Sequence, residues 1–358
     1  MNERACDACV ARSWLVGRLA GHLDNARSRI DQVLALGVDD LIEAIGGRET
    51  GRLEREFESL DVAEVRSRAC AAGLETVCGC DPGYPAGLRE LAAPPAMLYV
   101  AGGLVDVLGG ESVAIVGSRR ASPYGLDVAR SLGRGLAVSG LTVVSGMALG
   151  IDSAAHAGAL EGGGATVAVL PASADRPYPA GKRWLHRRIV ATGAAVSELG
   201  PTATGVRRWM FPARNRIIAA LAAMTVVVEA GERSGALVTA RLAAGIGRPV
   251  GAVPGRVTTP QAAGPNGLLA GGADVVRGPQ DVLDHLFGAG TRAAGRARRV
   301  EAPPDLRPLL DAIAEGYETA AALARAGFGP DQGLAALAEL ELGGFVRRGA
   351  GGRFTVVS

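Results

Sequence analysis

Four segments of the sequence combine residue types that bind anionic groups. The first contains Gly117, Ser118 and Arg119, and the second contains Ser145 and Gly146. Glycine lets a backbone approach a ligand closely, serine hydroxyls and helix-start amides donate to phosphate oxygens, and arginine binds phosphate through two parallel hydrogen bonds. Both segments are therefore predicted to hold phosphate groups. For the first, a tight turn with a surface arginine is the alternative interpretation.

The third segment, residues 207–216, joins four arginines to two aromatic rings in a chain that is only 4% aromatic. Aromatic rings stack on unpaired bases while arginines neutralise phosphates, which is typical of single-stranded nucleic-acid binding. Pro212 suits a helix start, which would place Arg214 and Asn215 in the first helical turn. An arginine there is poorly matched to the helix dipole unless a polyanion is bound. The predicted contacts are Arg207, Arg208, Phe211, Arg214 and Asn215, with Trp209 as a second stacking ring. A core Trp and Phe flanked by solvated arginines is the alternative.

The fourth segment contains Ser234 and Gly235, which could form a third phosphate cradle or an ordinary capped turn. A Walker A motif, a G-x-S-x-G elbow and a G-x-G-x-x-G turn with an acidic ribose anchor are all absent from the sequence, which disfavours a nucleotide cofactor. Glu229 beside this turn leaves one enzymatic alternative, a nucleotide phosphoribohydrolase of the Rossmann-like lysine-decarboxylase-like group. His156 has no evident nucleophile or metal to serve and is predicted to be structural.

These segments need a scaffold that brings them together, and the pattern between residues 111 and 288 predicts one. Short β-branched runs alternate with amphipathic stretches, which indicates an α/β fold with a Rossmann-like, doubly wound parallel sheet. The predicted strands are 113–116, 142–144, 167–170, 194–196, 225–228 and 250–253, and the predicted helices lie near 124–139, 152–161, 181–192, 213–223 and 235–246. The four segments follow strands, and ligands bind at the carboxyl edge of such a sheet.

The rest of the chain divides by composition. Residues 1–75 have helical apolar spacing and predict a helical module. Residues 76–288 form the Rossmann-like domain, with a proline-rich connector at its start and one possible strand, 97–100. Residues 289–303 are Gly, Ala and Arg and predict a flexible basic linker. Residues 304–358 predict three helices and a hairpin, as in a winged helix that binds DNA or docks a protein.

Five cysteines without a signal peptide predict a reducing, cytoplasmic location. Cys6-x-x-Cys9 and Cys78-x-Cys80 could in principle supply four zinc ligands. The tight second spacing and the long separation favour reduced, unpaired thiols instead, so no metal and no cofactor are predicted. The sequence contains no apolar run of membrane-spanning length, so no membrane partner is expected.

Together the segments resemble the DprA (Smf) family of DNA-processing proteins of natural transformation, over residues 80–288. The matching strings include VAIVGSRRASPYG, VVSGMALGIDSAAHAGAL, FPARNRIIAAL and VVVEAGERSGALVTARLA. The resemblance implies an extended Rossmann fold that binds single-stranded DNA without catalysis, forms a homodimer and loads RecA recombinase. It implies DNA contacts by Arg119, Arg208 and Phe211, a SAM-like N-terminal module and a winged-helix tail. The segment 172–176 and Lys182 depart from the family pattern.

A third hypothesis is a duplex-specific regulator led by the tail. The predicted recognition helix, 332–342, carries Glu339 and Glu341 and contains no arginine. Negative charge disfavours insertion into a DNA groove, so we expect single-strand binding by the sheet domain instead.

Overall fold

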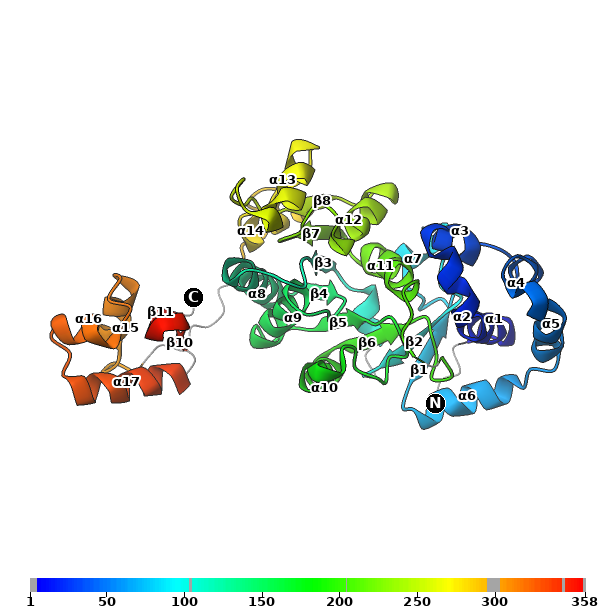
Figure 1. Cartoon of the computed structure of the whole chain (residues 1–358), viewed down its shortest axis with the longest axis horizontal. Helices are drawn as coiled ribbons and strands as arrows, with labels where there is room; N and C mark the ends of the chain where they lie inside the picture. Colours follow the sequence, from blue (N-terminus) through cyan, green and yellow to red (C-terminus); the bar gives the residue numbers. More distant parts are fainter. Residues whose placement is uncertain (1–4, 103–104, 204, 295–302, 343–344, 357–358) are drawn as a thin grey trace. The chain divides into compact units, whose positions relative to one another are not determined.

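The computed structural model describes residues 5–102, 105–203, 205–294, 303–342 and 345–356. The chain forms two compact units, Met1–Ala297 and Arg298–Ser358 (Figure 1). In the described part of the chain, no helix is long and apolar enough to cross a membrane.

A nine-stranded sheet in the order β1-β2-β6-β5-β4-β3-β7-β8-β9 is the centre of the first unit. The strands from β3 to β9 pair in parallel, whereas β1 and β2 add an antiparallel edge. Their bounds are β1 (Glu75–Cys78), β2 (Met97–Ala101), β3 (Ser112–Val116), β4 (Thr142–Ser145), β5 (Thr166–Val169), β6 (Ala194–Ser197), β7 (Met224–Val227), β8 (Val250–Ala252) and β9 (Asp274–Val275). The predicted α/β class with a Rossmann-like, mostly parallel sheet is confirmed.

Helices cover both faces of the sheet because the central strands are apolar on both sides. Val113 and Ile115 belong to one buried cluster and Ala114 and Val116 to the other, as alternation along a strand requires. The first face is covered by α8 (Pro123–Val138), α9 (Ile151–Glu161), α10 (Arg183–Thr192) and α14 (Pro279–Phe287). The second is covered by α7 (Ala86–Arg89), α11 (Met210–Leu221), α12 (Gly235–Gly245) and α13 (Ala263–Ala270).

The β-branched runs predicted the six central strands to within about a residue, and β1 and β9 are the strands that the sequence missed. β1 begins at the end of the segment expected to be helical. The sequence does not reveal it, because a strand of four residues is too short to show a periodic pattern. α11 also differs from its prediction: it begins at Met210, so Pro212 is its third residue and Arg214 lies beyond its first turn. The dipole argument made for Arg214 is therefore wrong.

The N-terminal helices pack against the sheet through two buried clusters, one of which contains Trp209. The helices are α1 (Asp7–Arg18), α2 (Ala20–Leu23), α3 (Ile30–Leu34), α4 (Val38–Gly46), α5 (Thr50–Glu58) and α6 (Val62–Ala71). Trp209 is fully buried among them, and its indole Nε1 donates to the Ala20 carbonyl at 2.8 Å. The helices and the sheet thus belong to one compact unit, and the domain boundary at residue 75 stays a prediction.

The start of the predicted linker is packed on this unit. Arg292 forms an ion pair with Glu111 at 2.6 Å and lies over the Phe287 ring at 4.8 Å. These contacts disagree with a flexible segment that begins at residue 289, because a charge pair and a ring contact fix this arginine. The stretch 295–302 of the predicted linker lies outside the described residues.

The second unit contains three helices and a hairpin in the predicted order. They are α15 (Arg307–Ala314), α16 (Ala320–Arg325), α17 (Pro330–Leu342), β10 (Val346–Arg348) and β11 (Phe354–Val356). Its core includes Leu309, Leu323, Leu340 and Phe354. The assignment of this unit to the winged-helix class stays a prediction.

Candidate functional site

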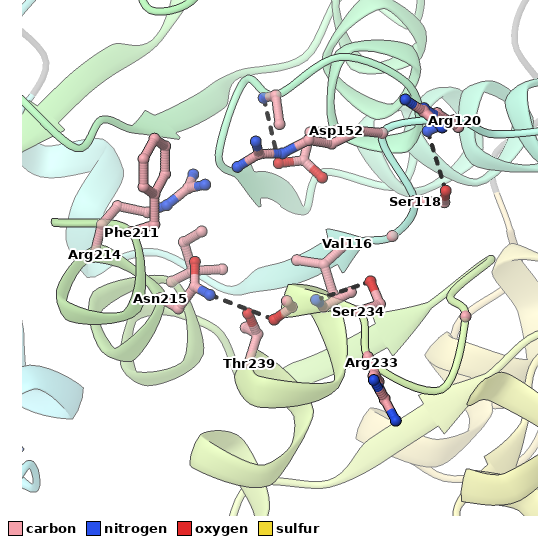
Figure 2. A pocket seen from close by; sticks show the side chains of 17 residues that line it. Val116, Ser118, Arg120, Asp152, Phe211, Arg214, Asn215, Arg233, Ser234 and Thr239 are labelled. Carbon is pink, nitrogen blue, oxygen red and sulfur yellow. Dashed lines mark hydrogen bonds between the residues drawn. The ribbon is translucent and has the colours of Figure 1, made fainter. Parts of the chain in front are cut away.

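A pocket of about 480 Å³ opens where the strand order of the sheet reverses, between β3 and β7. Successive crossovers run from β3 toward β6 on one side and from β7 toward β9 on the other, so the loops after β3 and β7 diverge and leave a crevice. Figure 2 shows three walls: the loop after β3, the start of α11, and the turn that leads into α12. The lining residues include Gly117, Ser118, Arg119, Arg120, Asp152, Phe211, Arg214, Asn215, Arg233, Ser234, Gly235 and Thr239.

The loop after β3 is fixed by the buried Glu229 at the end of β7. The Ser118 amide donates to the Glu229 carbonyl at 2.6 Å. The two Glu229 carboxylate oxygens accept from Ser122, one from its amide at 2.8 Å and the other from its hydroxyl at 2.5 Å. A Cβ on Gly117 would lie 2.8 Å from the Glu229 carbonyl oxygen, so only glycine lets the two strand ends come this close.

This loop places a cation against an aromatic ring. The guanidinium carbon of exposed Arg119 lies 5.1 Å from the Phe211 ring centroid. The Tyr178 ring centroid lies 5.6 Å from that of Phe211, and the two rings are tilted by 55°. A guanidinium over a ring face is a favourable cation–π contact. The arrangement is therefore a platform with a ring for stacking and a charge for phosphate in one place.

Arg214 lines the same pocket with a buried side chain. Its guanidinium is buried and donates to the Val169 carbonyl at 3.0 Å, while its Nε has no hydrogen-bond partner. A Cβ on Gly146 would lie 1.4 Å from a guanidinium nitrogen of Arg214, so this side chain occupies the space that any larger residue at 146 would take.

Asp152 supplies the opposite charge. Its carboxylate accepts from the Gly146 amide at 3.2 Å and the Ala148 amide at 3.4 Å. Burial raises the pKa of Asp152, and the charge of Arg214 acts against that rise. Burial likewise lowers the pKa of Arg214, with the charge of Asp152 opposing it. The two buried charges stabilise each other. Asp152 lies in the first turn of α9, whose N-cap is Gly150.

The third wall offers backbone amides. Ser234 caps α12 by accepting from the Ala236 amide at 3.3 Å, and the Asn215 side chain donates to the Gly235 carbonyl at 3.4 Å. The first turn of α12 thus opens into the pocket beside exposed Arg233. A helix N-terminus next to an arginine is suited to an anion.

The remaining predicted residues lie outside the pocket. Ser145 is fully buried and donates to the Ile115 carbonyl at 2.6 Å, so its hydroxyl is not available to a phosphate. Gly146 is buried against the Arg214 guanidinium and does not line the pocket. Arg207 and Arg208 are exposed but do not line it.

The prediction that Trp209 is a second stacking ring is wrong. The ring is fully buried and its indole N–H is hydrogen-bonded, so the alternative of a core tryptophan holds. Four further residues at or beside the pocket were not among the predicted contacts, namely Arg120, Arg233, Tyr178 and Thr239. The first two stand inside the quoted segments and could have been found there, whereas the other two carry no local signal.

Two further residues have structural partners. Both Glu229 oxygens are engaged by Ser122, so this carboxylate is not free to act as the general base that a phosphoribohydrolase needs. His156 is buried, and its Nδ1 lies 2.7 Å from the Thr166 hydroxyl oxygen. Because that hydroxyl donates to the Val143 carbonyl, Nδ1 is the donor to Thr166.

Comparison with known proteins agrees with the resemblance in the motifs. Residues 75–287 match the family model for DNA recombination-mediator protein A. The chain is 41% identical to a DNA processing protein DprA of Mycobacterium tuberculosis over 73% of this chain and 64% of that protein, so it spans less than two thirds of that relative.

Two solved structures are similar as well. The X-ray structure of DprA from Streptococcus pneumoniae superposes with a TM-score of 0.64 at 32% identity, covering 78% of this chain and 98% of the other. A structure of DNA processing protein A from Helicobacter pylori, concerned with its single-stranded DNA binding mode, superposes with a TM-score of 0.54 at 31% identity, covering 60% and 95%.

The buried His156 predicts a pH dependence of stability. Burial lowers its pKa to about 3 from the ordinary 6.5, so unfolding takes up a proton at intermediate pH. The stability that neutral His156 contributes is complete above pH 6.5 and is lost as the pH falls toward 3, by about 1.4 kcal/mol per pH unit. Urea unfolding of the wild type and His156→Gln at several pH values should give a slope shallower by that amount in the variant. Parallel stability curves would contradict the assignment.

Proposed function

Because the chain belongs to the DNA recombination-mediator protein A family, we propose that it binds single-stranded DNA in the pocket between β3 and β7. The observation that carries the proposal is Arg119 over the Phe211 ring, in a pocket that is also lined by further arginines. The ring offers a stacking surface to one base, and the charge beside it neutralises a neighbouring phosphate. DNA processing as the wider role is supported by the similar DprA proteins.

The charges around the pocket favour a polyanion. Arg119, Arg120 and Arg233 are exposed, and the buried Arg214 is balanced by Asp152. Phosphates would therefore bind chiefly to the three exposed arginines and to the amides at the start of α12, because the charge of Arg214 is already opposed. Exposed Arg207 and Arg208, immediately before α11, would extend the path of the strand beyond the pocket.

Single strands should be preferred over duplexes because a base can stack on Phe211 only when its face is exposed. The ring is partly exposed and already contacts Tyr178 on one side, so it is held in place before the base arrives. A ring that is fixed in advance loses little conformational entropy on binding. This mode is independent of base identity, since every base has a π-face.

RecA loading and dimer formation are the finer parts of the proposal, and they are supported only by the resemblance to DprA. A non-enzymatic role is proposed with them, because Glu229 is engaged by Ser122 and the sequence contains no phosphate loop of a hydrolase.

Replacing Phe211 separates stacking from packing. Phe211→Leu keeps an apolar side chain without a π-face and should weaken binding to oligo-dT by about 1–3 kcal/mol, that is, roughly 5- to 150-fold. Phe211→Tyr keeps the ring and should bind within a few-fold of wild type. Fluorescence anisotropy with single-stranded and duplex oligonucleotides measures both, and equal affinities for Phe211→Leu and wild type would refute the stacking role.

Replacing Arg119 tests the phosphate contact. Arg119→Ala should lower the affinity and make the slope of log affinity against log salt shallower by about 0.7, the value for one phosphate of a single strand. Arg68→Ala is the matched control, because Arg68 is also an exposed arginine but lies on α6, outside the pocket, and pairs with Glu64. An Arg119→Ala slope equal to that of wild type and Arg68→Ala would remove Arg119 from the interface.

RecA loading predicts a kinetic effect on filament assembly. The protein should shorten the lag before RecA hydrolyses ATP on single-stranded DNA, and Phe211→Leu should not, because loading requires prior strand binding. An unchanged lag together with intact DNA binding would refute the loading role and leave the DNA-binding role unaffected.

Dimer formation is tested separately. Light scattering of the free protein should give twice the chain mass, and the mass of a single chain would contradict the proposed homodimer.

A further inference from the structure

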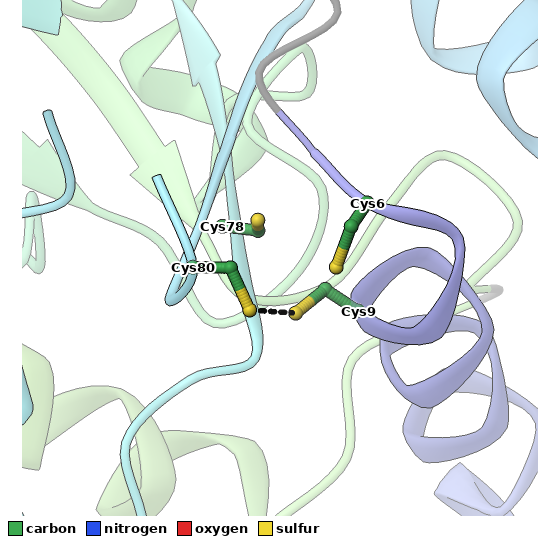
Figure 3. Close-up of side chains that lie close together, drawn as sticks. All are labelled: Cys6, Cys9, Cys78 and Cys80. Carbon is green, nitrogen blue, oxygen red and sulfur yellow. Dashed lines mark hydrogen bonds between the residues drawn. The ribbon is translucent and has the colours of Figure 1, made fainter. Parts of the chain in front are cut away.

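Four cysteine sulfurs converge at the junction of the N-terminal helices and the sheet (Figure 3). Cys6 is the N-cap of α1 and Cys9 lies in its first turn, while Cys78 ends β1 and Cys80 lies in the turn that follows. Their Sγ atoms all lie within 4.8 Å of one another. Residues from two chain segments about 70 positions apart thus meet in one small volume.

The spacing of the sulfurs matches a single tetrahedral ion. A zinc–sulfur bond of about 2.3 Å places the sulfurs of a tetrahedral site roughly 3.8 Å apart. Cys9 Sγ and Cys80 Sγ are 3.9 Å apart. A disulfide requires about 2.0 Å, and all four cysteines are free thiols in the structure.

Other contacts hold the two cysteine pairs in place. Arg66 on α6 pairs with Asp7 at 2.6 Å and donates to the Ala5 carbonyl, which fixes the start of α1. The Gly79 amide between Cys78 and Cys80 donates to the Ala96 carbonyl at 3.0 Å, and Arg89 donates to the Gly79 carbonyl. The ligand geometry is therefore organised by the protein's own hydrogen bonds, as expected of a site whose ligands are supported by surrounding groups.

We propose that Cys6, Cys9, Cys78 and Cys80 bind one structural zinc ion. Four thiolates form a closed coordination shell of soft ligands, which selects zinc over the hard cations that prefer oxygen and leaves no position for catalysis. Cys78 is buried and Cys9 half-buried, whereas Cys6 and Cys80 are exposed, so one side of the site stays open to the incoming ion. The sequence spacing favoured unpaired thiols over a zinc site, whereas the convergence of the four sulfurs favours the zinc site.

The ion would link α1 to the antiparallel edge of the sheet. α1 leads directly into α2, whose Ala20 carbonyl accepts the Trp209 indole next to the start of α11. Zinc would therefore stabilise the helical module that positions the N-terminus of α11, on which Phe211 stands. The proposed role of zinc is to stabilise the fold, and the evidence for it does not rest on the proposed DNA binding.

Metal analysis of the full-length protein tests the proposal. Protein purified without chelators should contain about one zinc ion per chain by inductively coupled plasma mass spectrometry. Cys9→Ser and Cys80→Ser should each reduce this to below about 0.1 ion per chain. Cys70→Ser is the matched control and should keep the full content, because Cys70 is an exposed cysteine on α6 outside the cluster.

Two measurements on the wild type keep the test valid if the variants do not fold. Replacement of the ion by Co²⁺ should give the visible absorption of a tetrahedral thiolate site, and chelation should lower the melting temperature. Iron in place of zinc, a metal-free protein with a Cys9–Cys80 disulfide, or zinc retained by both serine variants would each overturn the proposal. A wild-type protein that contains one zinc ion per chain but does not bind single-stranded DNA would support the zinc site and contradict only the proposed DNA binding.

Discussion

The bond network of one buried carboxylate, Glu229, organises the pocket. It joins the end of β7 to the loop after β3, the two strands on either side of the point where the sheet reverses. The closeness of this contact accounts for Gly125, since a Cβ there would lie 2.4 Å from the Glu229 carboxylate. Because the loop is tied down at Ser122, Arg119 projects from a fixed base and reaches the Phe211 ring.

α11 connects this pocket to the rest of the first unit by presenting different side chains in different directions. Phe211 and Asn215 face the pocket, and Arg214 reaches under it to the end of β5. Arg216 forms an ion pair with Glu198, the residue that follows β6. One helix therefore carries the ring, the supporting charge and the attachment to the far half of the sheet, so a shift of α11 would change all three together.

The N-terminal helices contribute to the site without lining it. Their contact with the fully buried Trp209 sets where α11 begins. The four cysteines lie at the other end of α1, where it meets β1. The same helical module thus connects a candidate metal centre with the base of the candidate DNA site.

The sequence by itself determined the sheet class and the loops that form the pocket, because β-branched runs buried on both faces and Gly-Ser turns are local signals. Eight of the twelve predicted site residues line the pocket, namely Gly117, Ser118, Arg119, Phe211, Arg214, Asn215, Ser234 and Gly235.

Only the tertiary structure decided which polar groups face solvent. Ser145 and Trp209 have suitable chemistry for a ligand but are buried against Ile115 and Ala20. The charge of the buried Arg214 is opposed by that of Asp152, which lies far from it in the sequence. The cysteine cluster could not be predicted from the sequence either, because Cys9 and Cys80 are 71 positions apart and only the packing of α1 at this edge of the sheet brings them together. Burial and long-range proximity arise from how whole elements pack, and spacing along the chain does not encode either one.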